Sequence, residues 1–297
     1  MSVPISQRKA LRPTLCLFAC ESLNQDWTTA LPAAAALELI HNFSLIHDDI
    51  QDGDLERRHR PTVWSLWGQP QALVAGNAMR TLADITALRL VERGVADEKA
   101  LRTSFVLTRG YLHMTRGQCL DLSFEDTLDI KLEEYLSMIS FKTGDLIRCG
   151  LEMGALIASN DENVIAAFAR CGSSLGRAFQ IRDDVLGIWG DETATGKAVG
   201  NDIRRKKKSF PIVYALETAA DTARQKLVEI YSKDELDERD VEDVLTVLDE
   251  LGVADYAQEM TREKADLALQ EVSRVTMPSW ARREIEEMVE FLAARQY

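Results

Sequence analysis

Residues 31–62 decide the fold, and they read LPAAAALELIHNFSLIHDDIQDGDLERRHRPT. The segment from Ala33 to Ile46 is apolar at helical spacing and follows Pro32, a favourable first-turn residue, so it predicts one largely buried helix. This helix ends in His47-Asp48-Asp49-Ile50-Gln51-Asp52. The C-terminal end of a helix is negative, so neighbouring aspartates there are disfavoured unless a cation lies among them. The segment therefore predicts a metal site.

The three aspartates are placed to bridge divalent ions rather than to enclose one. Asp48 and Asp52 are four residues apart and share a helix face, whereas Asp49 points about 100° around the axis. A group of arginines follows directly: Arg57, Arg58 and Arg60. An acidic helix end beside a basic loop is expected where magnesium holds a diphosphate from one side and arginines hold it from the other. The alternative is a solvated acidic helix end.

A second apolar helix ends in the same way. Asp183-Asp184 follows an apolar run that begins at about Leu175, and the loop 190–200 and the basic run Arg204–Lys208 come next. The acidic cluster 237–243 differs, because polar residues are interleaved with its acids. The order apolar helix, paired aspartates, loop and basic cluster thus occurs twice, which favours a functional site over chance.

These blocks resemble the trans-isoprenyl diphosphate synthases, and the chain is most similar to short-to-medium-chain members that form geranylgeranyl diphosphate. The matching blocks, spread over nearly the whole chain, are Lys9-Ala10-Leu11-Arg12-Pro13, His41, Leu45–Asp52, Arg57–Thr62, Gly117-Gln118, Lys142–Gly144, Phe179–Asp184 and Gly196–Lys208. The resemblance implies a transferase that condenses isopentenyl diphosphate with dimethylallyl, geranyl or farnesyl diphosphate. The steps are ionisation, condensation and elimination, and the departing diphosphate takes the proton.

The resemblance also implies the role of each site residue. Three magnesium ions would be held by Asp48, Asp49, Asp52, Asp183 and Asp184. The catalytic set would be Asp48, Asp52, Asp183, Lys142 and Arg57. The allylic diphosphate would be bound by Arg57, Lys142, Thr143, Gln180, Lys197 and Lys207, and isopentenyl diphosphate by Lys9, Arg12, His41 and Arg58. Physical chemistry agrees, because cations stabilise the charge that develops on the leaving diphosphate.

Product length is expected to depend on the residues that precede Asp48 on its own helix. A chain growing toward the helix N-terminus would pass the small Ser44 and meet Phe43 and then Ile40. Growth should therefore stop at an intermediate length, and the resemblance to geranylgeranyl-forming members implies a C20 product, geranylgeranyl diphosphate. The alternatives are a farnesyl diphosphate synthase, a class I terpene cyclase on the same fold, and a non-catalytic partner subunit.

The rest of the chain predicts an all-α fold in a single domain over residues 1–297, and the resemblance implies that this is a polyprenyl synthetase domain, an isoprenoid synthase helical bundle around a central cavity. Helical spacing is found in the segments 13–23, 70–91, 99–122, 132–158, 163–189, 210–231, 234–251, 254–275 and 279–295. Gly144 interrupts one of them, and we expect a kink there. The second aspartate motif ends in Gly187, where many members have a third acid.

Composition limits the partners. A net charge of -13 and a pI near 4.9 argue against binding to nucleic acid or to an anionic membrane surface. The five cysteines form no CxxC pair and indicate reduced thiols in a cytoplasmic protein. No apolar segment approaches about 18 uninterrupted residues, so we expect no stable membrane insertion. The resemblance implies a homodimer.

Overall fold

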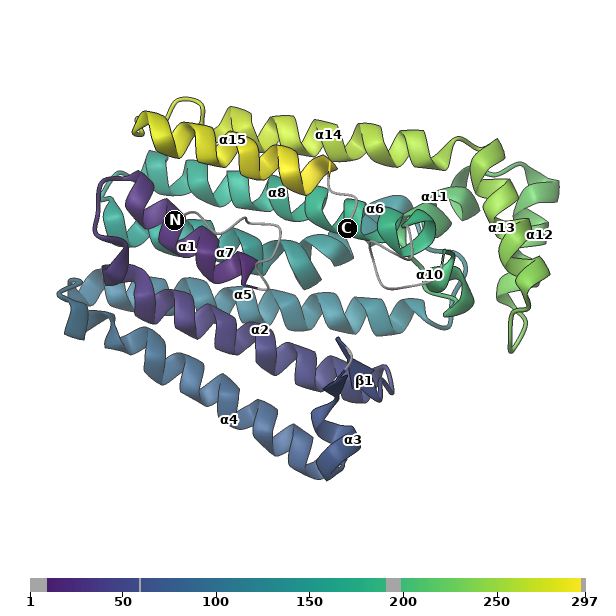
Figure 1. Cartoon of the computed structure of the whole chain (residues 1–297), viewed down its shortest axis with the longest axis horizontal. Helices are drawn as coiled ribbons and strands as arrows, with labels where there is room; N and C mark the ends of the chain where they lie inside the picture. The colour runs from purple at the N-terminus through teal and green to yellow at the C-terminus, as the bar shows by residue number, and fades with distance from the viewer. Residues whose placement is uncertain (1–9, 59, 191–198, 295–297) are drawn as a thin grey trace. The chain divides into compact units, whose positions relative to one another are not determined.

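The computed structural model describes residues 10–58, 60–190 and 199–294 (Figure 1). Contacts between Cα atoms divide the chain into two compact units. Unit 1 comprises Met1–Tyr111, Leu146–Ala169 and Val275–Arg282, and unit 2 comprises Leu112–Asp145, Arg170–Arg274 and Arg283–Tyr297. The expectation of a single domain stays a prediction.

Unit 1 is built from N-terminal helices around α2. Its elements are α1 (Leu11–Ser22), η2 (Trp27–Ala30), α2 (Leu31–Gln51), β1 (Glu56–Arg57), β2 (Arg60–Pro61), α3 (Val63–Trp67), α4 (Gln69–Leu88) and η3 (Arg89–Arg93). It also contains parts of α5 (Asp97–Phe124), α7 (Asp145–Ala158), α8 (Glu162–Trp189) and α15 (Ser279–Ala294).

The predicted metal helix is α2, and it packs against α1 and α4. Pro32 lies in its first turn, where a missing backbone N–H costs nothing. Leu37, Ile40 and Phe43 are buried along its length. Figure 1 shows α2 and α4 side by side and running in opposite directions. The chain turns between them through a short antiparallel hairpin of β1 and β2, which the sequence pattern did not predict.

One segment, Trp27–Gln51, is long and apolar enough to span a membrane by length and mean hydropathy. Polar residues such as Glu38 and Asn42 interrupt its apolar run, which is why the sequence predicted no span. Buried helices of folded proteins meet the same criteria, and α2 packs on two neighbours. The finding is therefore weak support for a span, and the absence of stable membrane insertion stays a prediction.

Unit 2 contains the second aspartate motif and the C-terminal helices. Besides the remaining parts of α5, α7, α8 and α15, its elements are α6 (Leu132–Ile139), η4 (Ser140–Gly144), α10 (Asn201–Arg204), α11 (Phe210–Thr218), α12 (Asp221–Tyr231), α13 (Glu238–Glu250) and α14 (Val253–Val272). One buried cluster joins Tyr135 of α6, Ile181 of α8 and Phe210 of α11. The core of unit 2 therefore surrounds the end of α8.

Two predicted helices differ from the observed ones. The run 210–231 is not one helix, because Ala219 and Ala220 adopt extended backbone with ψ of 141° and 159°. The run 132–158 contains a π-turn at η4, where the N–H of Asp145 donates to the carbonyl of Ser140, five residues back. This irregularity lies where Gly144 predicted a kink.

Candidate functional site

The first aspartate motif lies at the C-terminal end of α2. Asp49 is 5% exposed and accepts a hydrogen bond from Nε of Arg57 in β1. Asp48 is half-buried and Asp52, the C-cap, is exposed. The backbone N–H of Asp52 donates to the carbonyl of Asp48 at 2.8 Å. Asp49, the buried or inner aspartate of the Asp48-Asp49 pair, is therefore held by the cationic side chain of Arg57.

The loop that follows α2 is fixed by its own backbone. The carbonyl of Asp54 accepts hydrogen bonds from the hydroxyl of Thr62 and from the indole N–H of Trp64, both at 2.8 Å. Arg58 has a φ of 54°, which is uncommon for a residue other than glycine. The adjoining hairpin holds Arg57 next to Asp49, so the acidic helix end and the basic loop form one local structure.

A second basic group lies beside the same helix. Nη1 of Arg12 in α1 is 3.2 Å from Nε2 of His41 in α2, and since an arginine can only donate, Nε2 is the acceptor. Burial, together with the charges of Arg12, Arg58 and Arg57, lowers the pKa of His41 to about 3. The imidazole is therefore neutral near pH 7, and the arginines around it favour an anionic ligand.

The second aspartate motif lies near the C-terminal end of α8. Asp183 is exposed, whereas Asp184 is fully buried. Asp184 accepts hydrogen bonds from the hydroxyl of Tyr135, from Nε2 of Gln180 at 3.2 Å, from Nζ of Lys207 at 3.0 Å and from the backbone N–H of Phe210 at 3.2 Å. Burial raises the pKa of Asp184, and the donors of Lys207 and Tyr135 oppose that shift. Asp184 thus joins three helices and the basic segment.

A further carboxylate completes this region. Nζ of Lys207 lies 3.2 Å from Oδ2 of Asp202, which is the second acid that this lysine contacts. Asp202 is buried, with 7% of its surface exposed. Although burial opposes the charge, Asp184, Asp202 and Asp183 together raise the pKa of Lys207. A Cβ on Gly187 would overlap the carboxylate of Asp202. Asp202 therefore occupies the space of a side chain at position 187, where many family members have a third acid.

The π-turn η4 presents two of the predicted residues. Nζ of Lys142 contacts Asp121 of α5, and the hydroxyl of Thr143 donates to Oε1 of Gln180 at 2.7 Å. A Cβ on Gly117 of α5 would overlap the backbone nitrogen of Lys142, so only glycine permits this approach. The π-turn therefore links to Asp184 through Gln180.

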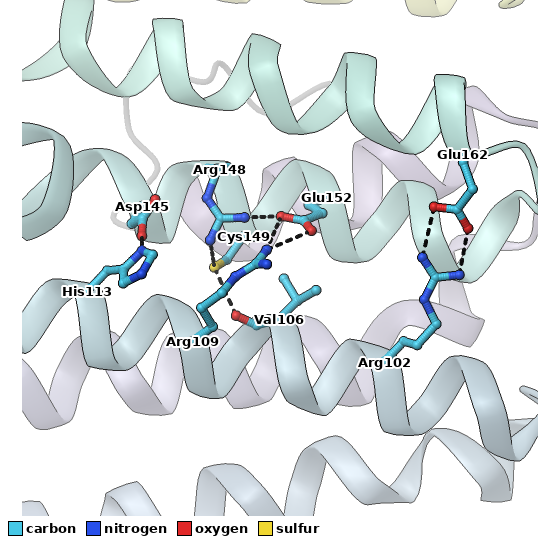
Figure 2. Close-up of polar contacts among 9 residues, drawn as sticks. All are labelled: Arg102, Val106, Arg109, His113, Asp145, Arg148, Cys149, Glu152 and Glu162. Atoms are coloured by element: carbon cyan, nitrogen blue, oxygen red, sulfur yellow. Dashed lines mark hydrogen bonds and ion pairs between the residues drawn. The ribbon is translucent and has the colours of Figure 1, made fainter.

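Polar contacts between α5 and α7 border this turn (Figure 2). In unit 2, Nδ1 of His113 contacts Asp145, the residue that follows the π-turn. In unit 1, Arg109 and Arg148 both bind the carboxylate of Glu152. The His113–Asp145 contact lies directly after the π-turn, and the pairs of Glu152 lie farther along α7, within unit 1.

The residues predicted to limit product length lie on the buried side of α2. Ile40 is fully buried and Phe43 is 6% exposed. The hydroxyl of half-buried Ser44 donates to the carbonyl of His41 at 2.8 Å. The Phe43 ring contacts the rings of His47 and Tyr111, with centroids 4.6 and 5.5 Å away. The role of these residues in product length stays a prediction.

The carboxylates of the two motifs differ in how well they suit magnesium. Within residues 10–58, 60–190 and 199–294, no three histidine, cysteine, aspartate or glutamate side chains come together as a metal-binding group. Mg²⁺ usually takes one or two carboxylates and completes its shell with substrate phosphates and water. The carboxylates of Asp48, Asp52 and Asp183 are exposed or half-buried. They suit ions that are also bound by substrate phosphates and water better than ions enclosed by protein ligands alone. The buried Asp49 and Asp184 are bound to protein donors, so their assignment as metal ligands stays a prediction.

The structure brings the predicted residues together in two sets. In unit 1, the first set lies along the second half of α2 and in the elements beside it: Arg12, His41, Asp48, Asp49, Asp52, Arg57 and Arg58. In unit 2, Lys142, Thr143, Gln180, Asp183, Asp184 and Lys207 lie around the end of α8. The predictions for Lys9 and Lys197 fall outside the described residues.

Three residues of this region were not predicted: Asp121, Tyr135 and Asp202. Asp202 stands just before the basic run 204–208, and Asp121 stands just after Gly117-Gln118, so each had a signal in its neighbours. Tyr135 had none, because its hydroxyl meets Asp184 only through the packing of α6 against α11.

The chain is similar to known proteins along most of its length. The family model for polyprenyl synthetase matches residues 4–248. A (2E,6E)-farnesyl diphosphate synthase of Mycobacterium tuberculosis is 36% identical over 291 residues, which cover 97% of this chain and 80% of that protein. The crystal structure of geranylgeranyl pyrophosphate synthetase from Pyrococcus horikoshii has a TM-score of 0.91 at 35% identity, over 98% of this chain and 88% of that one.

The chain is also similar to solved structures that contain ligands. One of these is a geranylgeranyl pyrophosphate synthase from Corynebacterium glutamicum, complexed with isoprenyl diphosphate and magnesium. Its TM-score is 0.84 at 25% identity, and the match covers 98% of this chain and 88% of that one. The fold is thus shared along nearly the whole chain.

Proposed function

The chain belongs to the polyprenyl synthetase family of prenyltransferases, and we propose that it joins isopentenyl diphosphate to an allylic diphosphate to give a longer trans-prenyl diphosphate. The allylic carbon–oxygen bond breaks, the double bond of isopentenyl diphosphate attacks the allylic carbon, and the released diphosphate takes the proton. One new carbon–carbon bond forms, and the product is five carbons longer than the allylic substrate.

The observation that carries this proposal is an arrangement that both aspartate pairs share. In each motif the inner aspartate, Asp49 or Asp184, is buried and bound to a basic residue from the segment that follows. The outer aspartates, Asp48 and Asp183, are more accessible. A helix end that retains such carboxylates suits a site for divalent cations and a diphosphate.

Basic side chains bind the two substrates in separate places. Arg12, His41 and Arg58 are proposed to hold isopentenyl diphosphate without metal, since Arg12 and His41 are in contact and His41 accepts no proton near pH 7. Lys142, Thr143 and Lys207, with Arg57 and Gln180, are proposed to hold the allylic diphosphate. Guanidinium and ammonium groups provide charge-assisted hydrogen bonds to phosphate oxygens.

Magnesium is the proposed cofactor, with three ions held by carboxylates of the aspartate motifs together with oxygens of the allylic diphosphate. When bound, the ions would neutralise the charge that develops on the leaving diphosphate. The chain contributes the outer carboxylates and keeps their neighbours fixed, because Asp49 and Asp184 are already bound to Arg57 and Lys207. The magnesium in the related synthase from Corynebacterium glutamicum supports this choice.

Geranylgeranyl diphosphate, a C20 product, is the proposed end of elongation. Phe43 lies five residues before Asp48 with a buried ring, and Ser44 is small. The relatives include both farnesyl and geranylgeranyl enzymes, so a C15 product is the second candidate. A class I terpene cyclase is disfavoured by the arginine cluster around His41, which a single-substrate cyclase does not need.

A homodimer is proposed as the working assembly. Large apolar residues are exposed on α4 and on the first part of α5: Leu73, Val74, Leu82, Ile85, Leu101 and Phe105. Several such residues on neighbouring turns are characteristic of an interaction surface, and a second copy of the chain offers the same chemistry. A cytoplasmic location stays a prediction.

Labelled isopentenyl diphosphate tests the proposal. The protein is incubated with magnesium and each allylic starter, and the products are dephosphorylated and sized. We expect incorporation with all three starters and a C20 main product. Incorporation that stops at C15 would favour the farnesyl alternative, and conversion of geranylgeranyl diphosphate alone into a hydrocarbon would favour a cyclase.

A further inference from the structure

We infer that product length is limited by a layer from three helices, in which Arg80 and Tyr111 form a second, charged stop beyond Phe43. The inference rests on the proposed function and names the part of the same site that would end elongation. All three residues belong to unit 1, on α2, α4 and α5.

The first part of the layer is aromatic. The rings of Phe43 and Tyr111 meet edge to face, with centroids 5.5 Å apart and an interplanar angle of 67°. On the other side, the ring of His47 lies 4.6 Å from that of Phe43. Phe43 is therefore wedged between a residue one turn along its own helix and a residue of α5.

The close approach of Gly76 to α2 shows which part of α4 lies beside His47 and Phe43. A Cβ at Gly76 would overlap the imidazole of His47 and come within 3.3 Å of Cδ2 of Phe43. Because α2 and α4 run in opposite directions, residues that follow Gly76 lie progressively nearer the N-terminal end of α2. Arg80, four residues later, is about 6 Å farther in that direction. That is the direction in which a chain growing from Asp48 would extend.

Arg80 is the charged part of the layer. Its Cζ lies 4.5 Å from the centroid of the Tyr111 ring, and Nη1 forms an ion pair with Asp84. The side chain is 18% exposed, and its buried Nε makes no hydrogen bond within the part of the chain that the structure describes. The guanidinium is therefore held by one aromatic face and one carboxylate.

The two parts of the layer resist a prenyl chain differently. An apolar ring such as Phe43 can be removed or turned aside, and hydrocarbon then fills the space at little cost. A prenyl chain that displaced Arg80 would take the guanidinium from Tyr111 and Asp84 and place hydrocarbon against a buried charge. When Phe43 alone is removed, the product should therefore grow only until its end reaches Arg80.

Product sizing in four proteins tests this layer. With labelled isopentenyl diphosphate, we expect Phe43→Ala to shift the main product by one C5 unit. The double variant Phe43→Ala/Arg80→Met should shift it by at least two units, because the charge is gone and the volume is nearly kept. Phe43→Ala/Arg80→Lys keeps a charge and should match Phe43→Ala.

The matched control is Phe43→Ala/Arg109→Met. Arg109 also lies over an aromatic ring, 5.7 Å from the centroid of exposed Phe105, and pairs with Glu152, so its loss should leave the Phe43→Ala products unchanged. If Arg80→Met does not fold, Phe43→Ala/Arg80→Leu removes the same charge with a different apolar side chain and should give the same two-unit shift. Active proteins whose double variants match Phe43→Ala overturn this inference alone, whereas a wild-type protein that incorporates no label overturns the proposed function.

Discussion

The ends of α2 and α8 carry similar aspartate pairs but stabilise them by different means. At the end of α2, Asp49 is bound by Arg57, only eight residues later and within the adjoining hairpin. At the end of α8, Asp184 is bound by Tyr135, 49 residues earlier, and by Lys207, 23 residues later. The first motif is thus a local structure and the second depends on the packing of unit 2.

The comparison separates two roles within each pair. The buried aspartate, Asp49 or Asp184, keeps the basic residue in place. Its more accessible neighbour, Asp48 or Asp183, can contact a ligand. The second motif also lacks a third acid in sequence, and Asp202 occupies the space above Gly187 instead. A similar arrangement of charge is therefore reached from two different patterns of residues.

The largest effect is expected at the outer aspartates. Asp48→Asn and Asp183→Asn should each lower turnover by at least about 10²-fold, because each would remove a group that stabilises developing charge. The unfolding free energy should change by less than about 0.5 kcal/mol for exposed Asp183. Steady-state kinetics at saturating magnesium, with chemical denaturation as the control, measure both. Near-normal turnover in both variants would contradict the assignment.

The next effect concerns stability at the inner aspartates. Asp184→Asn should lower the unfolding free energy by about 2 kcal/mol, since it leaves the partners of a buried carboxylate poorly matched. Asp49→Asn should cost about 1 kcal/mol, because Arg57 is 33% exposed and can be solvated in its place. Urea unfolding of the two variants measures the difference. Equal losses would mean that the motifs do not differ as described.

A smaller loss is expected for Tyr135→Phe. The buried hydroxyl donates to Asp184, but three other donors remain on that carboxylate, so we expect a loss of about 1 kcal/mol. Tyr214→Phe, in the same aromatic stack, is the control and should change stability less. If both substitutions cost the same, the hydroxyl of Tyr135 has no special part in holding Asp184.

The last effect is a pH dependence at His41, in the middle of α2. The pKa of His41 is lowered by burial and by Arg12 to about 3, below its ordinary value of 6.5. The unfolded chain therefore binds this proton first, so the contribution of His41 to stability is complete above about pH 6.5 and is lost as the pH falls toward 3. The slope is at most about 1.4 kcal/mol per pH unit. Denaturation between pH 5.5 and 7 should show it in the wild type and not in His41→Gln.

Much of the first motif could be predicted from sequence because its contacts are local. Asp48, Asp49 and Arg57 lie within one continuous segment, and the helical spacing before them indicates which side is buried. In the second motif, Tyr135 and Asp202 reach the site through packing between distant helices, and helical spacing carries no information about such contacts.

The fold shows the same limit. An irregularity at Gly144, though not its form as a π-turn, could be anticipated because glycine is disfavoured in a helix interior. The break between α11 and α12 could not, because Ala219 and Ala220 are good helix formers that adopt extended backbone here. The interruption precedes Asp221, the first residue of α12, and no glycine or proline marks it.

Binding of an unreactive allylic thiodiphosphate, measured by isothermal titration with and without magnesium, tests the division between outer and inner aspartates most directly. We expect magnesium to strengthen binding in the wild type and in Tyr135→Phe, where the outer aspartates are intact. In Asp48→Asn and Asp183→Asn, most of that gain should be lost. A gain from magnesium that survives in both aspartate variants, or equal binding by the wild type with and without the metal, would contradict the account.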